Sequence, residues 1–285
     1  MIPPEWPTLR DADLIARLRV PDAELYDHLP AYLERMPATV VDPDVRRRLA
    51  WGRDYPFARA DGPVVVRGAD VVPGAALDDA TARFPLLAIG SNGSPWRLAG
   101  KFRGVLGDPV RMTPAVLHDH DVCALPYPVT YGAFPAGLVH RPGTRVDVVV
   151  LEVTEAQLEW LAVTEFGYHL GALAASVERA AGPTLGRAFV FLQRPGLFAV
   201  DGHPVALAAI PAEGRRLTAM TQAELGTEWV RRRFGPGVGL DDGLMRAVGD
   251  PERFVREYLP PSLADAVHPG VPGFTPHPAA LPYVW

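Results

Sequence analysis

The stretch that decides the fold runs from Leu86 to Phe102 and reads LLAIGSNGSPWRLAGKF. The apolar residues at 86–89 lead directly into glycines and polar turn residues, which predicts a short buried strand followed by a tight loop. Ser94 and Pro95 then match the N-cap and the first position of a helix. The expected order is therefore strand, glycine loop and helix.

The loop residues Gly90, Ser91, Asn92 and Gly93 are the first candidate binding site. A tight glycine loop exposes backbone N–H groups beside a helix N-terminus, where the helix dipole adds partial positive charge. We expect these residues to bind a carboxylate, a phosphate or a developing oxyanion. A glycine loop that only turns the chain is the competing interpretation, and this motif alone leaves both open.

A second apolar run, VDVVVLEV at 146–153, predicts a central strand buried on both faces. Thr154 and Gln157 follow it in the pattern of a capping box, which begins a helix. We expect this helix to end at Gly167, with the glycine in the left-handed conformation after the last turn.

Glu165 is the candidate catalytic residue on this helix. Its spacing from Leu158 and Leu161 predicts that it lies on their buried face, whereas Glu155 and Glu159 lie on a solvated one. Burial favours the neutral form of a carboxylate, and the dipole at the end of a helix disfavours negative charge. Both effects suit a group that exchanges protons near neutral pH. A frayed helix end that lets Glu165 reach water is the alternative.

The order of these two segments resembles the γ-glutamylcyclotransferase family, whose usual signatures are Y-G-S-N and L-D-x-x-E-G-Y. The corresponding stretches here are 89–92 and 161–168, within a core of about residues 84–210. Ile89 stands where the family has tyrosine, which removes a ring and a hydroxyl that would contact the substrate. Phe166 is inserted between the glutamate and the glycine, which changes the expected position of the carboxylate.

The resemblance implies an α+β fold with a small mixed or antiparallel, barrel-like sheet and packed helices. The expected organisation has three parts. Residues 1–83 form a mostly helical N-terminal extension, 84–210 the γ-glutamylcyclotransferase-like core, and 211–285 a C-terminal extension that is helical and then proline-rich.

The reaction that the resemblance implies is intramolecular aminolysis of a γ-glutamyl amine or amino acid, which releases 5-oxoproline. Glu165 would move the protons, and the loop from Gly90 to Gly93 would bind the oxyanion. No metal and no organic cofactor is implied, and the partner is a small molecule with a γ-glutamyl-like group. Two alternatives stay open: a non-catalytic small-ligand or protein-interaction module on the same fold, and an enzyme that cleaves another γ-glutamylated metabolite.

Composition limits the other function classes. The 285-residue chain carries a net charge of −5, which favours neither nucleic acid nor an anionic membrane. A basic and apolar leader is absent, and so is a run of about 18 apolar residues, so we expect a cytoplasmic protein. A homo-oligomer stays open. Lys101 is the only lysine, and we interpret the excess of arginine as a bias of genome composition.

Three other residue types could bind a metal or act as a nucleophile. His118 and His120 have the spacing of strand residues on one face, but no third zinc ligand follows from the sequence, so we expect no metal site. Ser91 lacks the G-x-S-x-G context of a serine nucleophile. Cys123 lies in an apolar run and is expected to be a buried, unreactive thiol.

The flanking segments also carry local signals. Asp201-Gly202 between apolar runs predicts a hairpin with a type I′ turn, and the apolar residues after Pro260 predict a docked, extended tail. His169 is expected at the surface or at the start of a strand. Helices are predicted at 11–19, 21–35, 43–51 (with Asp42 as N-cap) and 221–234 (with a capping box at Thr221 and Glu224), and strands at 62–74, 172–179 and 187–193.

Overall fold

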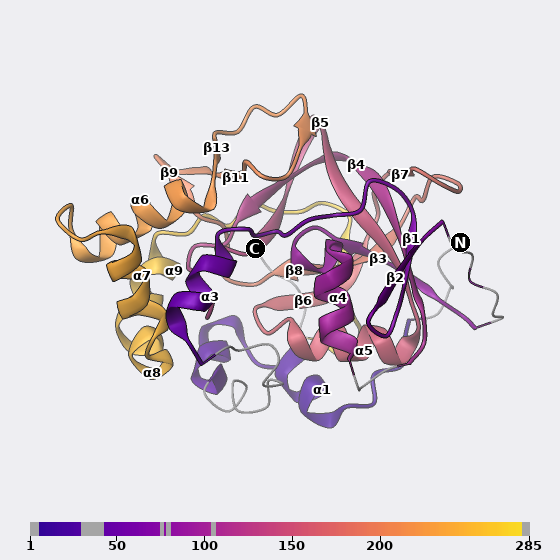
Figure 1. Ribbon diagram of the computed structural model, residues 1–285, viewed down its shortest axis with the longest axis horizontal. Coiled ribbons are helices and arrows are strands. Elements are labelled where there is room, and N and C mark those ends of the chain that lie inside the picture. The colour runs from indigo at the N-terminus through magenta and orange to yellow at the C-terminus, as the bar shows by residue number, and fades with distance from the viewer. Residues whose placement is uncertain (1–5, 30–42, 75–76, 78–80, 104–106, 281–285) are drawn as a thin grey trace.

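The computed structural model describes residues 6–29, 43–74, 77, 81–103 and 107–280, and it has a mixed α+β fold (Figure 1). Up to the end of the second long strand, the elements are α1 (Ala12–Leu18), η1 (Asp22–His28), α3 (Val45–Gly52), β1 (Val64–Arg67), β2 (Asp70–Pro73), β3 (Phe84–Ala88), η2 (Ser91–Gly93), α4 (Pro95–Phe102), β4 (Val110–Ala124) and β5 (Ala136–Val153).

The rest of the described chain adds shorter strands and a group of helices. They are α5 (Glu155–Thr164), β6 (Tyr168–Leu173), β7 (Val177–Arg179), β8 (Ala188–Gln193), β9 (Ala199–Val200), β10 (His203–Pro204), β11 (Ala206–Leu207), β12 (Ala212–Glu213), β13 (Ala219–Met220), α6 (Gln222–Phe234), α7 (Leu240–Val248), α8 (Pro251–Arg253), the π-helix η3 (Phe254–Tyr258), α9 (Leu259–Ala264) and β14 (Phe274–Pro276).

Most of the described strands form one large mixed sheet with the central order β13-β11-β4-β5-β3-β8-β6-β14, and β9 and β10 form a separate two-stranded sheet. The expected α+β class is confirmed, but the sheet is larger than predicted. The pairings between described strands leave its path open at β13 and β14, so they do not close a barrel. Among the described helices, none is both long and apolar enough to cross a membrane.

The central strand predicted at 146–153 is confirmed as the second half of β5, which lies between β4 and β3. Its valines are buried, because sheet neighbours flank β5 on both sides and both faces are covered. The strands predicted at 172–179 and 187–193 correspond to β6, β7 and β8.

Helix α5 begins with the predicted capping box: the Thr154 hydroxyl accepts from the Gln157 N–H, and the Gln157 side chain accepts from the Thr154 N–H. The helix ends at Thr164, before the predicted end, and Glu165 is its C-cap with φ −107° and ψ 64°. Gly167 is not among the residues with positive φ, so the left-handed C′ prediction is wrong. A side chain there would approach the Tyr127 hydroxyl to 3.2 Å, which accounts for the glycine.

Segments from both sequence extensions join the central sheet. The strands predicted at 62–74 are confirmed as β1 and β2, which pair with each other in antiparallel fashion, and β1 also pairs with β4. The C-terminal β14 pairs with β6. The helix after residue 43 has Asp44 as its N-cap, while the predicted cap, Asp42, lies outside the described residues. So does the second half of the helix predicted at 21–35, whose first half is the 3-10 helix η1.

The C-terminal helices α6, α7, α8 and α9 gather at one end of the molecule (Figure 1). The capping box of Thr221 and Glu224 is confirmed at the start of α6. The type I′ hairpin is also confirmed, since Asp201 and Gly202 both have positive φ and join β9 to β10.

The chain after Pro260 is docked as predicted, as far as residue 280, but its first part is helical rather than extended. Helix α9 carries Pro260 in its first turn, where the missing N–H of proline costs no hydrogen bond. The apolar residues at 281–285 lie outside the described chain. Val271 is buried, and the backbones of Val267 and Leu197 are joined by hydrogen bonds.

Val271 tests whether this docked segment stabilises the fold. Val271→Ala should lower the free energy of unfolding by about 2 kcal/mol, because about 0.8 kcal/mol is lost for each buried CH₂ equivalent removed. The matched control is Thr275→Ala, since Thr275 is exposed in the same segment. Equal unfolding free energies for both variants in urea titrations would show that the segment does not contribute to stability.

The ion pairs of Glu228 predict that the helical end of the molecule loses stability in acid. Hydrogen bonds from Arg231, with Arg232 beside it, hold the pKa of Glu228 at about 2. A carboxyl whose pKa is depressed in the folded state stabilises it above about pH 4.5, and this contribution is lost as the pH falls toward 2. Glu228→Gln should therefore be less stable than the parent at pH 7, and the difference should disappear at pH 2–3 in urea titrations. The exposed Glu252→Gln is the control, and a pH-independent difference would contradict the assignment.

Candidate functional site

A cavity of about 200 Å³ lies where the loop after β3, helix α4 and the end of α5 meet. Gly90, Ser91, Asn92 and Glu165 all line it, so the structure brings the two sequence-predicted site segments together. Gly93, the fourth predicted loop residue, is not among the lining residues. It is buried, and a Cβ there would lie 3.1 Å from the Arg59 Nε and 3.3 Å from Val149.

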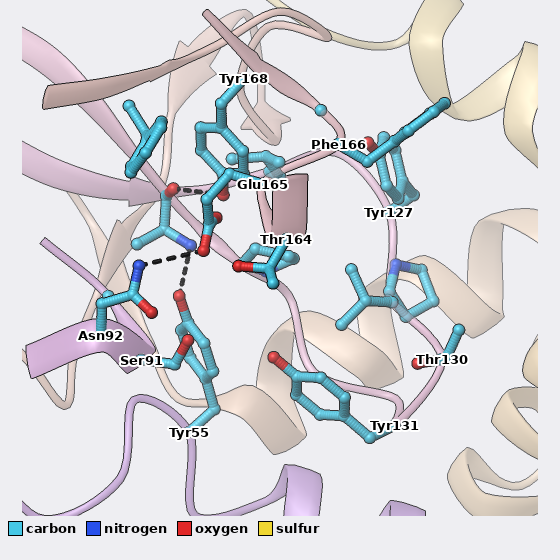
Figure 2. A pocket seen from close by; sticks show the side chains of 18 of the residues that line it. Tyr55, Ser91, Asn92, Tyr127, Thr130, Tyr131, Thr164, Glu165, Phe166 and Tyr168 are labelled. Carbon is cyan, nitrogen blue, oxygen red and sulfur yellow. Dashed lines mark hydrogen bonds between the residues drawn. The ribbon is translucent and has the colours of Figure 1, made fainter. Parts of the chain in front are cut away.

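The Glu165 carboxylate is held on one side of this cavity (Figure 2). Its Oε1 accepts hydrogen bonds from the Asn92 Nδ2 at 3.0 Å and from the Lys101 Nζ at 2.8 Å. The side chain is 16% exposed. Oε2 has no hydrogen-bond donor among the described residues, so it is available to a ligand. Glu165 lies just beyond the helix, which corrects the prediction that it belongs to the last turn.

Lys101 is the partner that the sequence interpretation missed. Its side chain is 5% exposed, and its ammonium donates to Glu165, to the Asn92 Oδ1 at 2.7 Å and to the Thr164 Oγ1 at 3.1 Å. Burial lowers the pKa of Lys101, and the Glu165 carboxylate opposes this shift.

The backbone at Glu165 is fixed by a side chain from α1. The Arg17 guanidinium donates to the carbonyl oxygens of Glu165 at 3.2 Å and Phe166 at 2.9 Å, and also to that of Ala162. The Ala162 carbonyl also accepts from the Glu165 N–H and the Glu165 carbonyl from the Tyr168 N–H, both at 3.3 Å, so Arg17 is an additional donor at the end of α5, where the helix dipole favours a cation. Arg17 therefore ends the helix at this point and directs Glu165 into the cavity.

The loop after β3 has backbone N–H groups in two different situations. Those of Gly93 and Ser94 donate within the turn, to Gly90 and Ser91 at 3.0 and 3.1 Å. The described residues provide no backbone acceptor for the N–H groups of Gly90, Ser91 and Asn92. These three residues line the cavity, and their role in binding stays a prediction.

Tyr55 occupies the space beside Gly90. A Cβ at Gly90 would lie 2.3 Å from the Tyr55 hydroxyl, so only glycine allows this close approach. The hydroxyl accepts from the Ala136 N–H at 2.8 Å, which leaves its own proton to be donated. Burial raises the pKa of Tyr55 strongly, so the phenol is neutral at physiological pH.

Four further tyrosines line the cavity: Tyr26, Tyr127, Tyr131 and Tyr168. Burial raises the pKa of each phenol, to about 12 for Tyr131. The hydroxyls of Tyr26 and Tyr127 bond each other at 2.7 Å, and that of Tyr168 donates to the Ala136 carbonyl at 2.8 Å. Their ring surfaces, rather than charges, therefore face the cavity.

Arg97 adds a second cation to the lining. It lies four residues before Lys101 in α4, on the same face of the helix. Its guanidinium stacks 4.7 Å from the centre of the Trp51 ring, and its buried Nε has no hydrogen-bond partner. Apart from the neutral phenols, the ionisable lining residues are Arg97, Lys101 and Glu165. The site therefore carries a net positive charge and favours a ligand with an anionic group.

The other sequence candidates lie away from this cavity. A register shift interrupts β4 between His118 and His120, and the His120 Nδ1 bonds the His118 carbonyl at 2.7 Å. In the described part of the chain, no three metal-binding side chains gather. Cys123 is fully buried, as predicted, and burial raises the pKa of its thiol. His169 is the second residue of β6, which confirms the expected position at the start of a strand, and its side chain is buried rather than at the surface.

Two signals in the sequence point to the residues that were missed. A chain with 28 basic residues has one lysine, and that lysine lies in the cavity, which is a stronger pattern than a composition bias alone explains. Its spacing of four from Arg97 predicts a shared helix face. Tyr55 has no such signal, because only the tertiary fold brings it to Gly90.

Comparisons with known protein families, curated proteins and solved structures find no match to this chain. We therefore infer the function from the geometry of the cavity.

The ion pair of Lys101 and Glu165 can be tested by a double-mutant cycle. Lys101→Met should lower the free energy of unfolding by about 3 kcal/mol, because it leaves the Glu165 carboxylate partly buried without a cation. The double variant Lys101→Met/Glu165→Gln should lose less than the sum of the two single variants, since both charges are removed together. Additive losses in urea titrations would show that the two side chains do not interact.

Proposed function

We propose that this protein is a γ-glutamylcyclotransferase-like enzyme, which releases 5-oxoproline from a γ-glutamyl amine or amino acid by intramolecular aminolysis. The observation that supports it most is the shared cavity, which both Glu165 and residues 90–92 line. Within the described chain, the Glu165 Oε2 has no donor and the N–H groups of residues 90–92 have no backbone acceptor. The reaction needs an acid/base group and donors for an oxyanion, and these groups supply both.

Substrate binding follows from the charges in the cavity. The γ-glutamyl group carries one α-ammonium and one α-carboxylate. The Glu165 Oε2 accepts from the ammonium, and Arg97, which has no ion-pair partner among the described residues, binds the carboxylate. These two contacts orient the α-nitrogen toward the side-chain amide and reduce the entropy cost of ring closure.

The chemical step transfers protons through Glu165. The carboxylate takes a proton from the α-ammonium, and the free amine attacks the γ-carbonyl carbon. A C–N bond forms, the oxyanion is stabilised by N–H groups of the loop, and the amide C–N bond breaks. Glu165 passes this proton to the leaving nitrogen. It then takes the second proton that the attacking nitrogen loses as the lactam forms and delivers it to the released amine, so the products are 5-oxoproline and an ammonium ion.

Tyr55 offers a replacement for the tyrosine that Ile89 lacks. Its hydroxyl lies against Gly90 and retains a proton to donate, although it comes from a segment far earlier in the chain. In this proposal, Tyr55 positions the reacting amide beside the loop and supplies the ring and hydroxyl that the resemblance requires.

A second candidate function is binding without catalysis. Its support is the direct contact between Lys101 and Glu165, because the ammonium and the Asn92 amide already occupy one oxygen of the carboxylate. In this case the same cavity would hold a small anionic or zwitterionic ligand, and no bond would be broken.

Glu165→Gln distinguishes the two functions. The glutamine keeps the shape of the side chain but accepts no proton, so release of 5-oxoproline from a panel of γ-glutamyl amides should fall about 10²–10⁴-fold. Glu213→Gln is the matched control, because Glu213 is exposed and does not line the cavity. A variant with an undiminished rate would overturn the mechanism. A parent protein that binds the amides but turns none of them over would support binding without catalysis.

A further inference from the structure

We propose that the wall of the cavity away from Glu165 is a subsite for a large apolar or aromatic group on the amine part of the substrate. This inference deepens the proposed function and rests on it for the identity of the amide. The subsite itself follows from the lining residues, and the binding of a ligand that cannot react is enough to test it.

Three separate segments build this wall. The region of η1 contributes Tyr26 and Leu29, and the loop between β4 and β5 contributes residues 127–131. The C-terminal helices contribute Val248, Pro251 and Phe254. In Figure 2, Tyr127, Thr130 and Tyr131 lie across the cavity from Asn92, Ser91 and Glu165.

The wall is chemically apolar despite its tyrosines. The hydroxyls of Tyr26 and Tyr127 satisfy each other, and that of Tyr131 interacts with the Ser91 side chain. A buried tyrosine whose hydroxyl is already paired presents its ring to a ligand. The charged lining residues come only from α4 and the end of α5, and of these Arg97 approaches the wall, with its guanidinium 6.0 Å from the centre of the Tyr131 ring.

The position and size of the wall point to the amine part of the substrate. Once the α-ammonium and the α-carboxylate contact Glu165 and Arg97, the amide nitrogen and its substituent are directed away from them. A small polar substituent would leave tyrosine rings and valines in contact with trapped water, at a cost in free energy. The cavity of about 200 Å³ extends from Glu165 and Arg97 to this wall, so the wall borders the part of that volume that the substituent enters.

The test compares two γ-glutamyl amides, the methylamide and the 2-phenylethylamide. The aromatic amide should have a KM at least tenfold lower, since each buried CH₂ equivalent contributes about fourfold in affinity. Binding is measured separately by calorimetry with the corresponding glutaric acid monoamides. These keep the carboxylate and the amide but lack the α-amine, so they cannot form 5-oxoproline.

Two valine variants locate the subsite. Val248→Thr keeps the size of a lining residue but adds a hydroxyl to the apolar wall, and it should reduce the preference for the aromatic monoamide about fivefold or more. Val255→Thr is the matched control, because Val255 is partly buried in the neighbouring π-helix and does not line the cavity. It should keep the preference of the parent.

The outcomes separate the subsite from the proposed function. A tenfold preference among the monoamides, without release of 5-oxoproline from either γ-glutamyl amide, supports the subsite and contradicts the enzyme. Turnover with equal KM values and equal monoamide affinities overturns the subsite and leaves the enzyme. An equal loss of preference in both valine variants would also overturn it, because the effect would not come from the wall.

Discussion

The contact between Lys101 and Glu165 is the interaction on which the site depends. Burial lowers the pKa of Lys101, and the neighbouring Glu165 carboxylate opposes this shift. Together, and bridged by Asn92, they keep opposite charges at 2.8 Å. The pair joins helix α4, the loop after β3 and the end of α5. The same contacts therefore hold these three segments together and place the charges in the cavity.

The sheet explains why these segments meet. Strand β3 is antiparallel to β5, and Phe84 at the start of β3 pairs with Val153 at the end of β5. Helix α5 follows β5 at once and returns along the sheet in the direction of β3. Its 10 residues rise by about 15 Å, and the five residues of β3 by about 16 Å. The end of the helix therefore arrives beside the loop that ends the strand, and Glu165 meets Asn92.

The sequence predicts those parts of the site that depend on local patterns. The strand, loop and helix after Leu86, the capping box at Thr154 and the inward position of Glu165 follow from periodicity and from known capping residues. The end of α5 does not, because Arg17 binds its last carbonyls from a helix almost 150 residues earlier. The role of Lys101 and the approach of Tyr55 to Gly90 likewise depend on contacts between segments that are far apart in the sequence. The extent of the sheet is another example, since β1 and β14 pair with core strands across long separations in the sequence.

The two extensions belong to the site rather than surrounding it. A Lys–Glu pair at an open surface contributes little, because water and salt screen it. Here the region of η1 and the helices after residue 240 cover the cavity, with Tyr26, Val248 and Phe254 among its lining residues. They exclude water from the ion pair and from the loop, which strengthens every electrostatic contact that a ligand makes there. In the proposed reaction, residues 84–210 supply the reactive groups. The two extensions supply the low-dielectric enclosure that those groups require.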